Sequence, residues 1–437
     1  MNNIVKLPIA ELKEYRSKCC FKNSAVQVKG EDGEMHKYPC IVLYEKETKI
    51  PIFYTGLERY MCNLEESSSL KNNTLAVRGY AICHCLNYIL YETNINSLHE
   101  CSINTIRRIL KYIKTKEDGS EYKKDTWIKY RNYILEFFCM YYKYNKDKFP
   151  FQYNGEEFEK KSIFDIYQNK NRSYVNTSFY LSPPKTTQRK NRILVDGYLD
   201  LLLDTAKKYD PEIVLGIALG AYAGLREGEV VNVSCGRIKI IRKYFEKISK
   251  IEIDLTDTAP YFKNWNKKTN PGSIKKYRVQ RVYDSFVSKI SDMYEYHLAL
   301  LESKGFDTAK DAPLFVNKQR NPMSVQTYSD RLKKLFYERF IPALKKTCER
   351  EGTYADNAAF IEAYEIEYPG AHMLRHWFTM YLLTKAKLQS AEIMRWRGDS
   401  SQKSMDAYIH ENGELIEIFE ESSYAFQAQI LEDIYSC

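Results

Sequence analysis

The chain has 437 residues, 44% of them hydrophobic, and a formal net charge of +9. That length exceeds what one ordinary hydrophobic core organises, so we expect two or three domains. No apolar run reaches the roughly 18 residues of a membrane helix, and the N-terminus lacks a basic segment followed by an apolar one, so we expect neither a membrane protein nor a secreted one. The eleven cysteines include no CxxC pair, which favours reduced thiols in a cytoplasm.

Basic side chains are unevenly distributed along the chain. Residues 101–150 hold 12 Lys or Arg against 6 Asp or Glu, and residues 237–281 hold 13 against 4. After Lys403 there is no Lys or Arg, although acidic residues continue. Two basic regions indicate a polyanion partner for the body, and the acidic tail indicates a protein partner. Two solvated lysine-rich surfaces are the alternative interpretation.

The first half of the chain predicts a short hairpin followed by helices. Residues 1–65 are expected to form an extension in which "YPCIVLYEKETKIPIFY" makes two strands around a charged turn. Residues 66–150 show apolar spacing typical of helices in "TLAVRGYAICHCLNYILYE", "SINTIRRILKYIKTK" and "DTWIKYRNYILEFFCMYYKY". Ser102 and Asp125 suit helix N-caps. We therefore expect a small helical bundle with basic faces.

The second half predicts a larger, mixed domain. Residues 151–190 lose periodicity and contain a Pro-Pro pair, which indicates a linker. A domain is expected over residues 191–412, followed by a helical tail over residues 413–437. "KIEIDL" and "KKYRVQRVY" predict a strand pair, so the fold class is mainly α with a small β-sheet. Helices are expected at 195–208, 211–223, 281–303, 324–350, 356–365, 370–385, 389–396, 402–410 and 414–434.

Two patterns in this domain place cations near turns. In "AYAGLREGEVVNV" the small-residue turn Ala223-Gly224 leads to Arg226, with Glu229 one helical turn later. Such an arginine is usually a surface residue. In "NKKTNPGSIKKYRVQRV" a lysine cluster lies on the turn of the predicted strand pair. The cluster is either solvated charge or a source of one ammonium group that donates a proton to a bound backbone.

Two further patterns follow towards the C-terminus. In "HMLRHWFTMYLL" His372 and Arg375 share a helix face, because they are three residues apart. His372 and His376 also have zinc spacing, but Met373 stands where the zinc-protease motif needs Glu and no third ligand is nearby. A buried, hydrogen-bonded histidine is the other interpretation of either side chain. In "RGDSSQKSMDAYIH" Tyr408 follows a short polar turn, and taken alone it is most simply structural.

In this order the four patterns resemble the tyrosine recombinase family of phage and transposon integrases. That family has Arg in a GLR-x-x-E motif, Lys on a β-hairpin, an H-x-L-R-H helix and then LGHSS…Y-x-H. Here they stand as "GLREGE", "KKTNPGSIKKYRV", "HMLRHWF" and "RGDSSQKSMDAYIH", with nine residues (408 − 399) from Asp399 to Tyr408. The resemblance covers residues 191–410 directly, and residues 70–147 by position and composition only. It implies a helical core-binding (SAM-like) domain and a mixed α/β catalytic domain that close as a clamp on DNA.

The resemblance also implies roles for individual residues. Arg226 and Arg375 would clamp the scissile phosphate, because guanidinium forks match phosphate oxygens and stay charged. Tyr408 would attack the phosphorus, with His372 as hydrogen-bond partner or general base, since a phenol with a pKa near ~10 needs activation. A hairpin lysine would protonate the leaving 5′-oxygen. Neither a metal nor another cofactor is implied.

The lysine is not fixed by the pattern. Lys268 is the first choice, because "K-T" followed by "R-V" resembles the family hairpin. Lys267, Lys263 and Lys276 compete with it, because the turn is longer than the usual family form.

Asp399 departs from the family, which has His or Trp at this sixth position. A carboxylate close to a phosphate repels it unless it is protonated or paired. Three interpretations follow: Asp399 points away and caps the next helix, it pairs with an Arg or His of the site, or Trp396 takes over the packing role. N-capping by Asp before Ser-Ser is the one we favour from sequence.

DNA contact and assembly are expected to involve both halves. The tail is amphipathic and acidic, which suits docking on protein better than contact with DNA. The resemblance implies that it docks on the next protomer and builds a tetramer on two double-stranded recombination sites; packing on its own domain is the alternative. An accessory DNA-bending protein is a further candidate partner, and the expected location is cytoplasmic, with the nucleoid. The DNA-binding candidates in the bundle are Arg107, Arg108, Lys111, Lys129 and Arg131.

The expected function is therefore a site-specific recombinase, the integrase or transposase of a mobile element. A type IB topoisomerase uses closely similar residues and is the alternative within enzymes. A DNA-binding protein that has lost its chemistry is the alternative outside them, because Asp399 occupies a position of the site.

Overall fold

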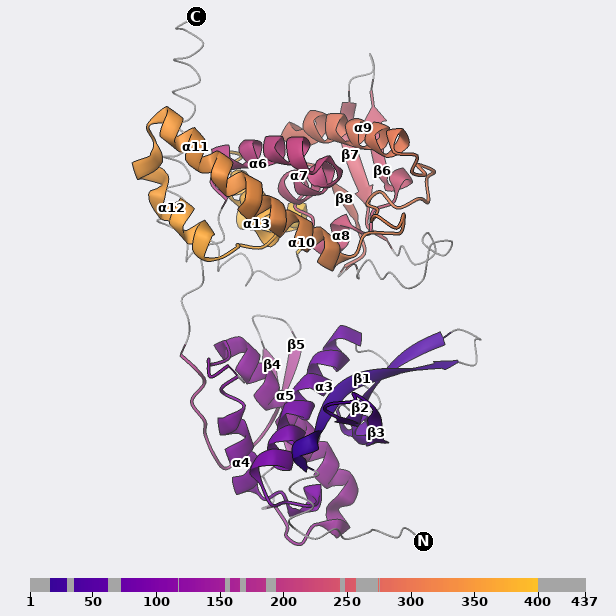
Figure 1. The fold of residues 1–437 in the computed structure, drawn as a ribbon, viewed down its shortest axis with the longest axis vertical. Helices are drawn as coiled ribbons and strands as arrows, with labels where there is room; N and C mark the ends of the chain where they lie inside the picture. Colours follow the sequence, from indigo (N-terminus) through magenta and orange to yellow (C-terminus); the bar gives the residue numbers. More distant parts are fainter. Residues whose placement is uncertain are drawn as a thin grey trace, which may run out of the picture. The chain divides into compact units, whose positions relative to one another are not determined.

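The computed structural model describes two compact units, Met1–Gln188 and Arg189–Cys437, each with its own core (Figure 1). Within them the described residues are 16–29, 35–61, 72–116, 118–153, 158–165, 170–185, 194–243, 248–256, 274 and 276–399. None of the helices in these ranges is long and apolar enough to cross a membrane.

The first unit begins with a three-stranded antiparallel sheet in the order β1-β2-β3. Its strands are β1 (Cys19–Lys29), β2 (Met35–Glu45) and β3 (Pro51–Tyr54). The β2–β3 pair confirms the predicted hairpin, whereas β1 was not predicted. The sheet packs on α3 (Asn72–Glu92), where the Asn87 amide accepts a hydrogen bond from the Phe21 N–H (2.7 Å) and donates one to the Phe21 carbonyl (3.0 Å). The sheet therefore belongs to the same unit as the bundle.

Two more long helices complete the predicted bundle, α4 (Ile103–Tyr112) and α5 (Lys124–Asn145). The Ser102 side chain accepts a hydrogen bond from the Thr105 N–H, which confirms the predicted cap. The prediction that Asp125 is an N-cap was wrong. Helix α5 begins at Lys124 with Lys123 as its N-cap, and Asp125 lies in its first turn. A carboxylate there is still favourable, since it faces the positive end of the helix dipole. Short 3₁₀ helices are η1 (Leu57–Tyr60), η2 (Leu98–Glu100) and η3 (Lys146–Lys148).

The stretch predicted as a linker contains a hairpin of β4 (Lys160–Asp165) and β5 (Lys170–Val175). Phe158 and Val175 are buried in the core of the first unit. The Tyr153 hydroxyl donates a hydrogen bond to the Cys101 carbonyl (2.5 Å). Sequence periodicity missed the hairpin because its strands are short and rich in Lys, Ser and Asn, so they show no apolar alternation.

The second unit combines a small antiparallel sheet, in the order β6-β7-β8, with a set of helices. The strands are β6 (Ile238–Arg242), β7 (Ile248–Asp254) and β8 (Val279–Arg281). The α-helices are α6 (Asp196–Tyr209), α7 (Val214–Tyr222), α8 (Glu227–Val230), α9 (Val287–Ser303), α10 (Val325–Leu335), α11 (Ile341–Glu351), α12 (Tyr354–Ile366), α13 (His372–Thr384) and α14 (Ser390–Arg397). The 3₁₀ helices are η4 (Pro211–Ile213), η5 (Cys235–Arg237) and η7 (Asp284–Phe286).

Helix α7 is the centre of this unit, since all nine of its residues are buried. It contacts α6, α9 and α13 (Figure 1). Gly220 lets α13 approach closely, because a Cβ there would lie 3.0 Å from Leu374. The close packing of α7 on α13 fixes the end of α7 relative to the start of α13.

The second unit confirms most of the predicted helices and shifts some of their ends. The region predicted as one helix over 324–350 is α10, a π-helical turn η8 (Phe336–Phe340) and α11. The helix predicted from residue 281 begins at Val287, and the second predicted strand is three residues long. The helices predicted at 402–410 and 414–434 lie outside the described residues.

Gly224 links α7 to α8 in a conformation that only glycine adopts easily. Its φ is +64°, and an added Cβ would lie 2.5 Å from Cδ1 of Phe378. We expect Gly224→Ala to lower the free energy of unfolding by roughly 2–5 kcal/mol, from backbone strain plus overpacking. The measurement is urea unfolding followed by tryptophan fluorescence.

Gly352→Ala is the matched control, because Gly352 has a φ of +70° and no atom within 4 Å of an added Cβ. It carries only the backbone strain, so its loss should be about 1 kcal/mol. Equal losses for the two variants would contradict the packing contribution at Gly224.

Candidate active site

Arg226 stands at the N-terminus of α8, directly after the turn at Gly224. Its backbone N–H donates to Oε2 of Glu229 (3.0 Å), and its Nη1 donates to Oε1 of the same carboxylate (2.9 Å). The Arg226 side chain is 25% exposed, whereas that of Glu229 is 1% exposed. Glu229 thus fixes the arginine from the protein side and leaves Nη2 of Arg226 pointing elsewhere.

Arg375 lies in the first turn of α13 and is almost fully buried, with 1% of its side chain exposed. Its Nη1 donates to the Gly224 carbonyl, and its Nη2 donates to the Arg397 carbonyl (2.9 Å). Backbone carbonyls at the end of α7 and the end of α14 therefore hold this guanidinium. A buried charge needs such partners, because desolvation of an unpaired guanidinium is very costly.

The two arginines converge on one carboxylate oxygen. Oδ1 of Asp399 accepts from Nη2 of Arg226 (2.6 Å) and from Nη2 of Arg375 (2.7 Å). The two Nη2 atoms are therefore no more than 5.3 Å apart, the sum of these two distances. Residues separated by 149 positions in the sequence thus present two guanidinium groups to a single anionic group.

A third cation lies against Asp399 from the end of α14. Nε of Arg397 is 3.0 Å from Oδ2 of Asp399, an ion-pair distance without the alignment of a hydrogen bond. The Arg397 side chain is 3% exposed. Asp399 itself follows Gly398, whose φ of +65° ends α14.

Arg278 connects the sheet to the same cluster. Its two terminal nitrogens donate to the two oxygens of Glu229, at 2.8 and 3.1 Å. Gly398 leaves room for it, because an added Cβ would lie 2.3 Å from Nε of Arg278. Two residues later, within β8, Gln280 donates to the Trp396 carbonyl (2.5 Å). The segment before β8, the end of α14 and α8 are therefore joined around Glu229.

The described part of this cluster carries a net charge of +2. Its members are the cations Arg226, Arg278, Arg375 and Arg397 and the anions Glu229 and Asp399. Because four positive charges face two negative ones, the cluster attracts a further anion.

Burial and neighbouring charges shift the pKa values of Arg375 and Glu229. Burial lowers the pKa of Arg375 to about 9, Arg397 adds to the reduction, and Asp399 opposes it. Arg375 therefore remains charged at neutral pH, with the help of Asp399. Burial alone would raise the pKa of Glu229, but hydrogen bonds and charge from Arg278 and Arg226 hold that pKa below its ordinary value.

Of the remaining predicted catalytic residues, some lie within the described part of the chain and others lie outside it. His372 is the first residue of α13, three positions before Arg375, and its ring lies 4.9 Å from that of His376. Lys276 is described, exposed and close in sequence to Arg278. Lys268 and Tyr408 lie outside the described residues, as do Lys263 and Lys267. Among the residues that are described, no group of three or more His, Cys, Asp or Glu is arranged to hold a metal ion.

The interpretation of Asp399 favoured from sequence was wrong. Its side chain does not point away from the site but pairs with Arg226 and Arg375. The reason is electrostatic: three guanidinium groups around one buried position need a counter-ion more than a solvated helix terminus needs a cap. Trp396 packs edge-on against Tyr283 (5.1 Å) and lies under Arg281.

The five DNA-binding candidates of the first unit occupy α4 and α5. Arg107, Arg108 and Lys111 are exposed on α4, opposite its buried positions. Lys129 is exposed on α5, whereas Arg131 is half-buried over the Trp127 ring, and burial lowers its pKa. Four of the five are thus free to meet solvent.

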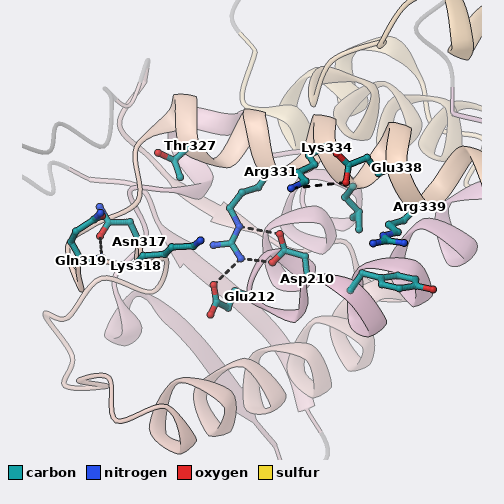
Figure 2. A pocket seen from close by; sticks show the side chains of 12 residues that line it. Asp210, Glu212, Asn317, Lys318, Gln319, Thr327, Arg331, Lys334, Glu338 and Arg339 are labelled. Atoms are coloured by element: carbon teal, nitrogen blue, oxygen red, sulfur yellow. Dashed lines mark hydrogen bonds and ion pairs between the residues drawn. The ribbon is translucent and has the colours of Figure 1, made fainter.

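A separate pocket of about 630 Å³ lies between η4 and α10 (Figure 2). None of its lining residues belongs to the arginine cluster. Its central cation, Arg331, donates to Asp210 (3.0 Å from Nε) and Glu212 (2.7 Å from Nη2). These two carboxylates already neutralise Arg331. The pocket therefore attracts a bound anion less strongly than the arginine cluster does.

Sequence reasoning missed Arg278 and Arg397 as members of the cluster. Both lie inside the quoted patterns, but an arginine on a strand edge or at a helix end is common on protein surfaces. The available signal was Glu229, one helical turn after Arg226, because a carboxylate that the fold buries needs cationic partners.

Comparison with known proteins gives similarity at the level of solved structures. No model of a known protein family matches the sequence, and no curated protein matches it. The XerH site-specific recombinase bound to its difH substrate matches with 16% identity over 77% of this chain and 74% of that chain, at a TM-score of 0.44. The Tn1549 transposon integrase in complex with transposon right end DNA matches with 14% identity over 83% and 99%, at 0.43. DNA-bound lambda integrase matches with 11% identity over 78% and 89%, also at 0.43. Since these TM-scores are below 0.5, functional assignment depends on the motifs and the site.

Glu229 gives the cluster a pH-dependent stability. A carboxylate whose pKa is lowered on folding stabilises the folded state above its unfolded pKa and loses that effect as the pH falls through its folded pKa. We expect Glu229→Gln to cost about 3–5 kcal/mol of unfolding free energy at pH 7, because it removes the buried negative charge that Arg226 and Arg278 share. This difference from wild type should shrink as the pH falls below 4.5, the ordinary value.

The measurement is urea unfolding of both proteins at several pH values between 7 and 3.5. Asp284→Asn is the control, because Asp284 forms an exposed pair with Arg281, and its effect should be small throughout. A Glu229→Gln difference that does not change with pH would contradict the assignment.

Proposed function

We propose that this chain is a tyrosine recombinase, a site-specific enzyme of a mobile element that cleaves and rejoins DNA strands through a 3′-phosphotyrosine intermediate. The observation that carries the proposal is the convergence of Arg226 and Arg375 on one oxygen. The excess positive charge of the cluster and the order of the four sequence patterns support it. A silent DNA-binding protein would have no need to bury a charged Arg375 at this point.

In the proposed reaction the two arginines hold the scissile phosphate. Negative charge grows on its non-bridging oxygens as the phosphorus becomes five-coordinate, and guanidinium groups already fixed by the protein stabilise that charge without reorganising. They take the place that metal ions hold in other phosphoryl-transfer enzymes, so the proposed mechanism is metal-independent. Glu229 and Arg278 are positioning residues, because Glu229 accepts hydrogen bonds from Arg226 and Arg278 holds the Glu229 carboxylate in place.

Tyr408 is the proposed nucleophile. Its phenolic oxygen attacks the phosphorus, the bond from phosphorus to the 5′-oxygen breaks, and the 3′-phosphate remains on the tyrosine. His372 accepts or orients the phenolic proton. Lys268 donates a proton to the leaving 5′-oxygen. Attack by a 5′-hydroxyl of another strand reverses these steps, so no external energy source is needed.

The first unit and the tail have proposed roles in assembly. Exposed cations on α4 and α5 contact DNA phosphates and position the duplex. The two units together clamp the DNA, the acidic tail docks on a neighbouring protomer, and a tetramer forms on two sites. An accessory DNA-bending protein would assist where the sites lie far apart.

The nucleophile is tested by covalent capture. A nicked duplex that carries the end of the mobile element is incubated with the protein in EDTA, and SDS-resistant protein–DNA adducts are separated on a gel. We expect adducts with wild type and none with Tyr408→Phe, because the variant lacks the attacking oxygen. Tyr424→Phe, the same change at a tyrosine nearer the C-terminus, is the matched control and should form adducts.

Three outcomes would contradict parts of this proposal. Adducts with Tyr408→Phe would exclude Tyr408 as the nucleophile. Adducts that form only without EDTA would refute the metal-independent mechanism. Relaxation of supercoiled DNA without exchange between sites would favour the type IB topoisomerase.

The proton donor is tested with a modified leaving group. Lys268→Ala should slow cleavage of ordinary DNA by about 10²–10⁴-fold, the usual contribution of general acid catalysis. A substrate with sulfur in place of the 5′-bridging oxygen needs no proton donor, because a thiolate leaves readily, so it should restore the rate. Lys263→Ala, Lys267→Ala and Lys276→Ala serve as controls. Rescue of one of these variants in place of Lys268→Ala would move the role to that lysine.

A further inference from the structure

Asp399 occupies the position at which Arg226 and Arg375 would meet a phosphate. Its Oδ1 lies 2.6 and 2.7 Å from their Nη2 atoms, distances typical of charge-assisted hydrogen bonds. The two guanidinium groups also donate hydrogen bonds to Glu229 and to backbone carbonyls. The carboxylate is therefore the partner that both arginines share.

We propose that Asp399 is an internal stand-in for the scissile phosphate, which keeps the empty site in order and must leave when DNA binds. This inference rests on the proposed function, in which the two arginines bind that phosphate. Asp399 is accordingly a positioning residue that sets the affinity of the site for its substrate. A phosphate and this carboxylate cannot share the two Nη2 atoms, because like charges at that distance repel strongly.

The local backbone allows the exchange without unfolding α14. The N–H of Asp399 donates to the Met394 carbonyl (3.0 Å), and that of Gly398 donates to the Arg395 carbonyl (3.1 Å). These bonds close the end of α14 and anchor the backbone of Asp399. Only the side chain has to rotate for the oxygen to leave the two arginines.

The charge balance explains why the empty site needs this anion. Without Asp399 the described cluster would hold four cations and only Glu229 as an anion. Arg375, which is 1% exposed, would lose the carboxylate that favours its charged form. With phosphate bound, the ligand supplies the same negative charge, so the carboxylate is no longer required.

Inorganic phosphate is the probe that tests this exchange. Melting temperatures of the full chain are measured against phosphate concentration at constant ionic strength, for wild type and Asp399→Asn. Asp399→Asn should melt lower without phosphate and bind phosphate about tenfold or more tightly, because the competing charge is gone. Asp399→Glu, which keeps the charge, should retain an affinity close to wild type. Asp399→Ser replaces the asparagine variant if that protein does not fold.

Two controls separate this effect from a general change in charge. Asp204→Asn changes the net charge equally at an exposed pair with Lys207 and should leave phosphate affinity unchanged. Adding Arg226→Ala to Asp399→Asn should abolish the gain. Unchanged or weaker phosphate binding by Asp399→Asn, or an equal gain in Asp204→Asn, would overturn the inference.

Failure of the inference and failure of the proposed function have different signatures. Phosphate binding needs neither Tyr408 nor the recombination site. Tighter phosphate binding by Asp399→Asn without adducts from any protein would leave the anion exchange standing and reject the recombinase. Adducts from wild type without tighter phosphate binding by Asp399→Asn would leave the recombinase standing and reject the exchange.

Discussion

The buried charge of Arg375 is the constraint on which the second unit depends. A guanidinium with 1% of its side chain exposed is tolerated only when each face finds a partner. The partners come from three places: the carbonyl of Gly224 after α7, the carbonyl of Arg397 at the end of α14, and the carboxylate of Asp399. One of these connections spans 151 residues and the other two span 22 and 24, so satisfying one charge fixes α13 relative to the end of α7 and the end of α14.

The packing of α7 explains how these segments come close enough. Its residues are all buried, and two glycines admit neighbours that a Cβ would crowd: Gly220 within α7 admits Leu374, and Gly224 just after α7 admits Phe378. Both neighbours lie on α13, within one turn of Arg375. The same contacts that bury apolar surface therefore bring the turn before Arg226 against the start of α13. Core packing and the geometry of the site are thus determined by the same residues.

The sequence predicted those parts of the molecule that depend on local pattern. Most helices of the second unit follow from periodicity, and Arg226 and Arg375 follow from their motifs. The hairpin β4–β5 could not be found in this way, because polar strands of six residues have no periodic signature. Arg278 and the orientation of Asp399 depend on which charges meet after folding. That information resides in tertiary contacts: the carboxylate at position 399 faces inward because Arg226 and Arg375 arrive from elsewhere in the chain.

The carboxylate at position 399 reduces the repulsion between the gathered arginines while no phosphate is bound. The family that this sequence resembles has His or Trp at this position. Such a side chain would leave Arg226 and Arg375 to repel each other until a phosphate binds. Asp399 reduces that repulsion in the protein without DNA, because one carboxylate oxygen accepts hydrogen bonds from both guanidinium groups at 2.6 and 2.7 Å and offsets part of their charge. In the proposed function these favourable contacts must be broken before the scissile phosphate can bind. The free protein is thereby more stable, but its affinity for phosphate is lower. Arg226 has 25% of its side chain exposed and is the more exposed of the two arginines. An incoming phosphate would therefore first compete with the carboxylate at Arg226.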